Sequence, residues 1–184
     1  MAFFAQKTSN TGVNDPFTEA LVSLSSDDPY TFVSASVLRN SDIYAAVNII
    51  ASDIASNPIV CDTPLLNTMI NDRPSDIIDG YHLKYALAAN MLLNGNSFAL
   101  ILPNHMLKFI PNNQMTVEQD DVSGELTYTY APDGRTERQI APDNILHFKY
   151  FTKDGASGIS PLYALKDEQK IQTAGNKLLT GFFN

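Results

Sequence analysis

The sequence predicts an α+β fold in which a helical half packs with a small antiparallel β meander and a C-terminal helix follows. Three observations support this prediction. Between residues 41 and 94 apolar side chains recur at the three- and four-residue steps of a helix that faces a core. Between residues 98 and 150 short apolar or alternating runs are separated by turn residues, which is typical of strands. From residue 160 the helical period returns.

The first predicted helix covers residues 41–56. Asn40 or Ser41 can cap its start, Asp42 suits the positive end of a helix, and Asn57 with Pro58 ends it. One apolar stripe is expected to face the core: Ile43, Val47, Ile50 and Ile54. A second, shorter helix is predicted over residues 65–70, with a turn that ends at Pro74.

A long helix and an apolar strand are predicted for residues 76–102. Ser75 or Asp76 can cap the helix, and Gly95 can end it in the left-handed conformation. One face is expected to consist of Tyr81, Tyr85, Ala88, Ala89 and Leu92. All five residues from 98 to 102 are apolar, which predicts a central strand covered on both faces. The uncharged run from residue 85 to 107 is interrupted by Gly95 and by amides, so no bilayer crossing is expected.

The remaining predicted strands form the meander. They cover residues 107–110, 115–118, 126–130, 136–141 and 146–150, and proline, glycine and aspartate residues mark the turns between them. After the glycine-containing loop at 154–159, Ser160 can cap a helix and Pro161 fits its first turn. This C-terminal helix is expected to run through Leu178.

Both ends of the chain carry aromatic residues outside the predicted core. Residues 1–40 read as an N-terminal arm, either a partly disordered terminus or a segment that docks on a neighbouring subunit. Two adjacent phenylalanines precede the final Asn184, which indicates packing on another chain or a sequence cut short of its natural end. The candidate subunit contacts are therefore Phe3, Phe4, Phe17, Phe182 and Phe183.

Composition argues against several function classes. The 184 residues carry a net charge of −8, and the 12 Lys and Arg residues are scattered, so tight nucleic-acid binding is not expected. The single cysteine, Cys61, cannot form an internal disulfide, and the first residues lack a secretory pattern, so a reducing, cytoplasmic origin fits best.

No catalytic, cofactor or metal residue is predicted. The three histidines, His82, His105 and His147, lack metal-site spacing and are expected to be structural. The loop from Gly155 to Gly158 lacks the residues of a phosphate-binding motif. Three acids lie near the end of a predicted strand and favour a solvated turn over a cation site: Glu118, Asp120 and Asp121.

The order of these pieces resembles the N-terminal part of tailed-bacteriophage portal proteins of the HK97 type. The resemblance covers residues 41–184 and includes a Tyr-rich hairpin and the Phe-Phe-Asn ending. Its most specific parts are Gly95-Asn96, His147 and residues 158–161. The motifs are SDIYAAVNIIASDIASNPI from Ser41, LLNTMINDRPS from Leu65, ALAANMLLNGNSFALI from Ala86, LKFIPNNQMTV from Leu107, IAPDNILHFKYF from Ile140 and DGASGISPLYAL from Asp154.

The resemblance implies a wing-like domain at 41–184 whose last helix leads toward a stem and clip that this sequence lacks. It also implies a non-enzymatic subunit of a dodecameric ring in the virion, at the portal vertex of the capsid, made in the cytoplasm of a bacterial host. Terminase, capsid and head-tail adaptor proteins are the implied partners, and double-stranded DNA passes through without tight binding. No membrane is involved.

Two other function classes remain open at this stage. One is a truncated or free-standing interaction module derived from a prophage portal gene, which binds portal subunits or a host partner. The other is an enzyme, which requires a polar cluster that the sequence does not show.

Overall fold

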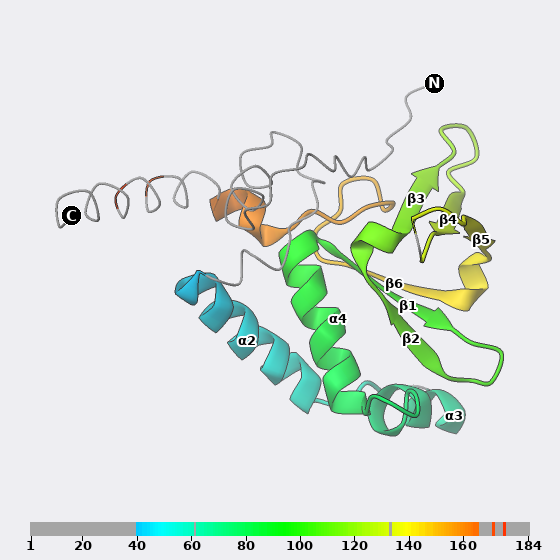
Figure 1. The fold of residues 1–184 in the computed structure, drawn as a ribbon, viewed down its shortest axis with the longest axis horizontal. Coiled ribbons are helices and arrows are strands. Elements are labelled where there is room, and N and C mark those ends of the chain that lie inside the picture. Colours follow the sequence, from blue (N-terminus) through cyan, green and yellow to red (C-terminus); the bar gives the residue numbers. More distant parts are fainter. Residues whose placement is uncertain (1–39, 61, 133, 166–170, 172–174, 176–184) are drawn as a thin grey trace.

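The computed structural model describes residues 40–60, 62–132, 134–165, 171 and 175. The predicted α+β class is confirmed, because helices precede two small antiparallel sheets (Figure 1). The helical part comprises α2 (Ser41–Ser56), α3 (Pro64–Asn67), the π-helical turn η2 (Thr68–Asp72) and α4 (Gly80–Asn94).

Each sheet has three strands. The first has the order β2-β1-β6, with β1 (Asn96–Ile101) between β2 (Leu107–Ile110) and β6 (Ile145–Lys149). The second is the meander β3 (Met115–Gln119), β4 (Leu126–Tyr130) and β5 (Arg138–Ile140). Short 3₁₀ turns connect them: η3 (Asn112–Gln114), η4 (Pro142–Asn144) and, after β6, η5 (Pro161–Leu165).

The first and last strands predicted for the meander do not belong to it, because β2 and β6 pair with β1 instead. Phe98 of β1 therefore lies opposite His147 on one side and opposite Ile110 on the other. Because β1 is apolar from Phe98 to Ile101, it is stabilised by a neighbouring strand on both edges and by cover on both faces. The prediction that this strand is central is confirmed.

Three apolar clusters form the core, and α4 lies between α2 and the first sheet (Figure 1). Leu83 and Leu87 of α4 pack on the sheet beside Ala99. Leu92 and Leu93, near the end of α4, pack on α2. The third cluster fills the space between the two sheets with residues such as Phe98 and Tyr128. Helix α4 is therefore buried on two sides.

The predicted stripe on α2 is only half buried. Ile43 and Val47 are buried as expected, but Ile50 and Ile54 are 44% and 41% exposed. The buried face continues instead through Ala51 and Ala55. The alanines allow α4 to approach α2 closely along that side, which turns the two isoleucines away from it. The expectation that all four apolar residues face the core was wrong.

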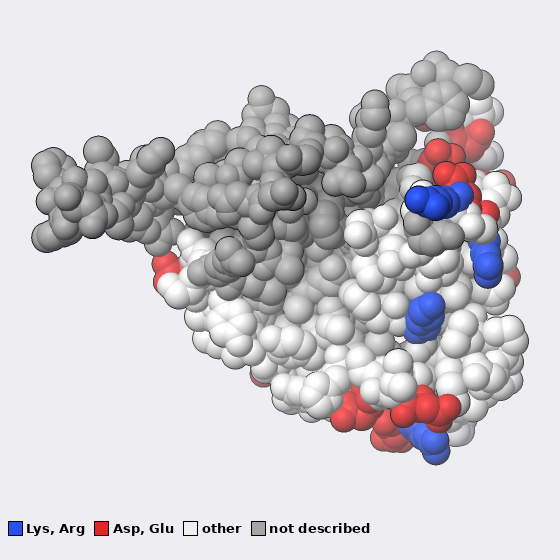
Figure 2. All heavy atoms as spheres, viewed as in Figure 1, with Lys and Arg blue, Asp and Glu red and all other residues white. Residues whose placement is uncertain are grey.

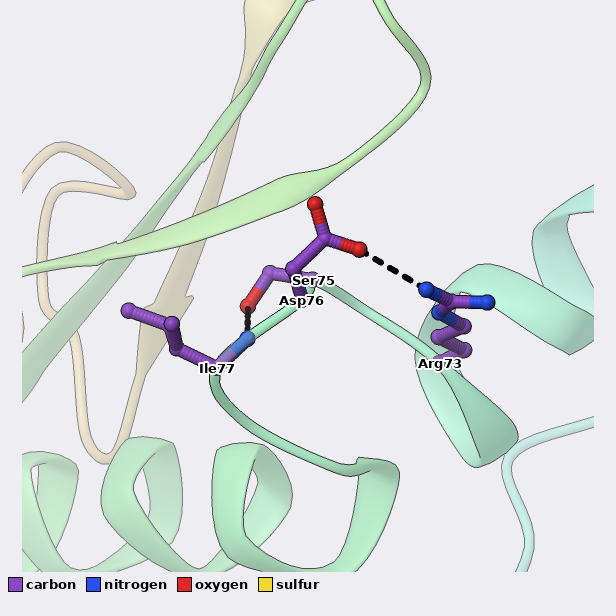
Figure 3. Close-up of polar contacts among 4 residues, drawn as sticks. All are labelled: Arg73, Ser75, Asp76 and Ile77. Atoms are coloured by element: carbon purple, nitrogen blue, oxygen red, sulfur yellow. Dashed lines mark hydrogen bonds and ion pairs between the residues drawn. The ribbon is translucent and has the colours of Figure 1, made fainter.

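Helix α4 begins later than predicted. Asp79 caps it by accepting a hydrogen bond from the His82 backbone N–H at 2.8 Å. The predicted caps belong to the preceding loop, where Ser75 accepts from the Ile77 N–H and Asp76 forms an ion pair with Arg73 at 2.8 Å (Figure 3). This loop is anchored by the buried Pro74, whose carbonyl oxygen accepts a hydrogen bond from the Leu107 N–H at 2.7 Å. The expected face is also partly wrong, since Tyr81 is exposed.

Helix α4 ends at the predicted residue. Gly95 has φ +76° and its N–H donates to the Met91 carbonyl oxygen at 2.8 Å, which completes the helix end. The described part of the chain contains no helix long and apolar enough to cross a membrane. Of the predicted C-terminal helix, η5 is described as a 3₁₀ turn that begins at Pro161, and most of the remainder lies outside the described residues.

Candidate functional site

The three most specific motif pieces meet at one buried junction. Gly95, at the end of α4, lies against Gly158 in the loop that follows β6. A Cβ atom on either glycine would overlap the backbone of the other segment, so only glycine fits at both positions. The contact places the start of the C-terminal segment directly on the end of α4.

Asn96 is the centre of this junction and is almost fully buried. Its side-chain amide donates to the Gly158 carbonyl oxygen at 2.9 Å, and its Oδ1 accepts from the Gly158 N–H at 2.7 Å. The two hydrogen bonds therefore pair both backbone groups of Gly158 with one side chain. This is the hydrogen bonding that a neighbouring strand would otherwise supply.

His147 on β6 joins the same amide to the second sheet. Its Nε2 lies 2.9 Å from Asn96 Oδ1, and its Nδ1 lies 3.3 Å from the Tyr128 hydroxyl on β4. Because Oδ1 has no proton to give, Nε2 must be the donor, and Nδ1 then accepts from the tyrosine in the neutral ring. The imidazole lies against the ring of Phe98, with the ring centroids 4.4 Å apart and the planes tilted by 32°.

Burial keeps this imidazole uncharged. Removal from water, assisted by the positive charge of Lys149, lowers the pKa of His147 from 6.5 to about 3. Burial also raises the pKa of Tyr128 above its ordinary value. Both groups are therefore neutral at physiological pH, and neither is prepared to exchange a proton there.

Further amides surround the junction. Asn112 donates to the Asn96 carbonyl oxygen at 3.0 Å, Asn90 donates to the same oxygen at 3.2 Å, and Asn94 donates to Asn90 at 2.9 Å. Ser160 donates to the Leu92 carbonyl oxygen at 2.9 Å and accepts from the Leu162 N–H, which confirms it as the predicted cap. Among the described residues every buried side-chain N and O atom has a partner. The network is complete in itself, which is typical of a structural junction.

Within the ranges that the structure describes, the other histidines and the three acids singled out in the sequence form no hydrogen bond with this junction. His82 pairs with Asp79, and His105 occupies a turn with φ +57°. Asp120 accepts from the Val122 and Ser123 N–H groups, and these hydrogen bonds lower the pKa of its carboxyl group. In the described part of the chain no cluster of three His, Cys, Asp or Glu residues is placed to hold a metal ion.

In the glycine-containing loop at 154–159, side chains of the same segment accept hydrogen bonds from the backbone N–H groups. Asp154 accepts hydrogen bonds from the Ala156 and Ser157 N–H groups at 2.8 and 3.2 Å, and Thr152 accepts from the Gly155 N–H. These backbone N–H groups therefore have partners without a phosphate. The loop ends in the Gly158 contact, so it introduces η5 into the core.

The predicted subunit contacts Phe3, Phe4, Phe17, Phe182 and Phe183 lie outside the described residues. The structure reveals other exposed apolar side chains that sequence reasoning missed. Those on α2 and beyond it are Tyr44, Ile49, Ile50, Ile54, Ile59 and Val60. The composition of α2 could have predicted these exposed side chains, because the helix is apolar on more than one side and contains only Asp42 and Asp53 as charged residues.

Charge is concentrated at the margins of the face shown in Figure 2. Acidic and basic side chains gather at its lower edge and at its upper right, while the described surface between them is mostly uncharged. Basic side chains appear singly in this view. This face of the molecule presents no basic patch that could grip a phosphate backbone.

A family model for the phage portal protein matches residues 41–184. The chain belongs to the phage portal protein family. The predicted resemblance to portal proteins is therefore confirmed over the region where it was recognised. The matched region includes the complete junction at Gly95, Asn96, His147 and Gly158.

Solved structures share the fold of this portal chain. A chain of the neck of an empty gene transfer agent (GTA) particle, computed with C6 symmetry, is 24% identical, has a TM-score of 0.60 and covers 74% of this chain. A chain of the virion of the native GTA particle is 22% identical, has a TM-score of 0.62 and covers 92%. A chain of the native GTA neck with C12 symmetry is 22% identical, has a TM-score of 0.59 and covers 89%.

The portal chain spans less than two thirds of these solved chains. The matches cover 42%, 46% and 50% of the respective structures. At these identities the likeness establishes the fold. Among curated proteins, none is significantly similar in sequence to this chain.

Proposed function

We propose that this chain is a structural subunit of the portal ring at one vertex of a phage head, through which DNA is packaged and ejected. The match of the portal family model over residues 41–184 is the observation that supports this most. The GTA neck with C12 symmetry, whose chain shares the fold, supports a dodecameric ring. A heterologous contact between two different patches of each copy is the geometry that closes such a ring.

A structural rather than an enzymatic role fits the junction. The side chains of Asn96 and His147 form hydrogen bonds within the chain. Because its hydrogen-bonded Nε2 already carries the proton and its pKa is low, His147 does not act as a general base near neutral pH. The net charge of −8 supports a conduit through which DNA slides without tight binding.

The remaining assignments follow from the same proposal. Residues 1–40 form an N-terminal arm, and the subunit contacts include the phenylalanines of both termini, Phe3, Phe4, Phe17, Phe182 and Phe183. The partners are the capsid protein, the terminase motor and the head-tail adaptor. The protein is made in the cytoplasm of a bacterial host and acts in the virion, at the portal vertex.

Labelled particles test this proposal. Particles purified from the producing cells are decorated with an antibody raised against the chain, after mild disruption, and imaged by electron microscopy. We expect label at one vertex, at the head-tail joint. Label distributed over the whole head, or none on intact or disrupted particles, would contradict the proposal.

A further inference from the structure

Helix α2 carries an apolar surface that remains exposed in the part of the chain that the structure describes. Ile50 and Ile54 lie one turn apart and continue the stripe that Val47 begins. Val47 is buried against Leu92 and Leu162, whereas the two isoleucines are 44% and 41% exposed. The stripe therefore extends past the place where intramolecular packing ends.

A segment of suitable pattern follows η5 in the sequence. From Ile171 onward apolar residues recur at Leu178 and Phe182, seven and eleven positions later, which is the spacing of one helical face. Nineteen residues follow Leu165, and η5 anchors their start beside α2 through Leu162. Fully helical, they would extend about 28 Å, and α2 with its 16 residues about 24 Å.

The charges of the two segments are complementary. Residues 40–60 contain two acids, Asp42 and Asp53, and no basic residue. The nineteen residues after Leu165 begin with Lys166, Asp167 and Glu168, but the part that carries the apolar face, residues 169–184, contains only the lysines Lys170 and Lys177 as charged residues. Opposite charges beside an apolar contact favour this pairing over the pairing of two α2 helices, which would bring like charges together.

Ile171, the described residue of this apolar face, is not buried by its own chain. Ile171 is 73% exposed in the same structure in which Ile50 and Ile54 are exposed, so each apolar surface still needs cover. We propose that the C-terminal segment of one copy, through Ile171, Leu178 and Phe182, packs on the α2 surface at Ile50 and Ile54 of a neighbouring copy. This inference rests on the proposed ring function and names the surface that receives the C-terminal phenylalanines.

A disulfide between the two segments tests the contact. The chain's single cysteine, Cys61, is replaced by serine, and Ile54→Cys is combined with Phe182→Cys in the complete chain. Oxidation of the assembled protein with copper phenanthroline should link neighbours into a ladder of multimers on a denaturing gel. The exposure of Ile54 makes this substitution compatible with folding, which a thermal melt checks.

A matched control uses Val122, which is 97% exposed in the β3–β4 connection. Val122→Cys with Phe182→Cys should give no ladder. A ladder of equal strength in this control would overturn the inference, because it would show that the C-terminus meets any exposed cysteine.

Two further outcomes also overturn it. A bond within one chain, seen as loss of both thiols without a ladder, would show that the segment covers its own α2. If closed oligomers form but no disulfide joins the cysteines at 54 and 182, the C-terminal segment does not pack on α2, and the ring proposal is unaffected. Failure of the wild-type protein to form any closed oligomer would instead contradict the proposed function.

A second variant measures what the surface contributes. Ile50→Ser combined with Ile54→Ser should weaken assembly at least about tenfold while the isolated chain keeps its fold. The concentration dependence of oligomer formation provides this measurement. An unchanged concentration dependence would contradict the inference.

Discussion

The junction at Asn96 and the outer surface of α2 use their side chains in opposite ways. At the junction, buried amides, an imidazole and two glycines satisfy one another completely within the chain. On α2, Ile50 and Ile54 remain exposed although the helix is apolar on more than one side. A satisfied buried network fixes the fold of one subunit, whereas an uncovered apolar surface indicates a contact with another molecule.

The glycine contact should show the largest effect. Gly95→Ala adds a Cβ atom that overlaps the backbone of Gly158 and Ser160, so we expect a loss of at least about 4 kcal/mol in the free energy of unfolding. Gly155→Ala is the matched control, since φ is +79° and nothing lies within 4 Å of the added atom. Its cost should be about 1–2 kcal/mol. Equal losses in urea unfolding would contradict the close contact.

The two sides of α2 should respond differently to charge. Val47→Asp places an unpaired carboxylate in the cluster with Leu92 and should cost about 3 kcal/mol or more. Ile50→Asp should cost at most about 1 kcal/mol, because water reaches that side chain. Thermal unfolding of the two variants measures the difference. If Ile50→Asp is as damaging as Val47→Asp, the orientation of α2 is wrong.

Asn96→Ala tests the hub of the junction. The change leaves the Gly158 N–H and carbonyl groups and the His147 Nε2–H without their partner, and we expect a loss of about 3 kcal/mol. Asn113→Ala, at an exposed position in η3, should change stability by less than about 0.5 kcal/mol. Denaturant titration compares the two variants, and a neutral Asn96→Ala would show that water replaces the amide.

Acid should weaken the junction through His147. The folded pKa is about 3 and the ordinary value is 6.5, so between these pH values the unfolded chain binds a proton that the folded chain does not. Stability is therefore retained above pH 6.5 and falls as the pH drops toward 3. At pH 5 this group should have cost about 2 kcal/mol relative to pH 7.

The His147→Gln variant isolates this effect. Its amide can still donate toward Asn96, and it takes up no proton between pH 7 and 5. We expect the melting temperature of the variant to vary less over this range than that of the wild type. His105→Asn is the control, since the position is exposed and asparagine tolerates its positive φ, and it should behave like the wild type. Parallel pH dependence in wild type and His147→Gln would contradict a buried neutral imidazole.

The elements that the structure confirms were predicted from short stretches of sequence. Gly95 ends α4, Pro161 begins η5 after the Ser160 cap, and the alternation in residues 126–130 forms β4 with Tyr128 and Tyr130 buried. Each of these three features depends on the conformational preferences of a few neighbouring residues, so it can be predicted from the local sequence. The portal resemblance also identified the residues of the junction, although their contact joins segments 62 positions apart.

Tertiary context decided the features that were not predicted. The side of α2 that is buried depends on the close approach of α4 along Ala51 and Ala55, and apolar spacing alone assigned Ile50 and Ile54 to it. The pairing of β6 with β1 depends on which edge of the first sheet is available. The cap of α4 depends on the loop that Pro74 anchors, since Ser75, Asp76 and Asp79 are all acceptable caps by sequence.

The mass of the native assembly tests the central claim most directly. The protein is isolated from its native source, and native and denaturing mass spectrometry are applied to the same sample. A portal ring subunit predicts a closed oligomer whose mass is a fixed multiple, about twelve, of the denatured chain. A denatured chain of 20.2 kDa that stays monomeric at all concentrations would contradict the account.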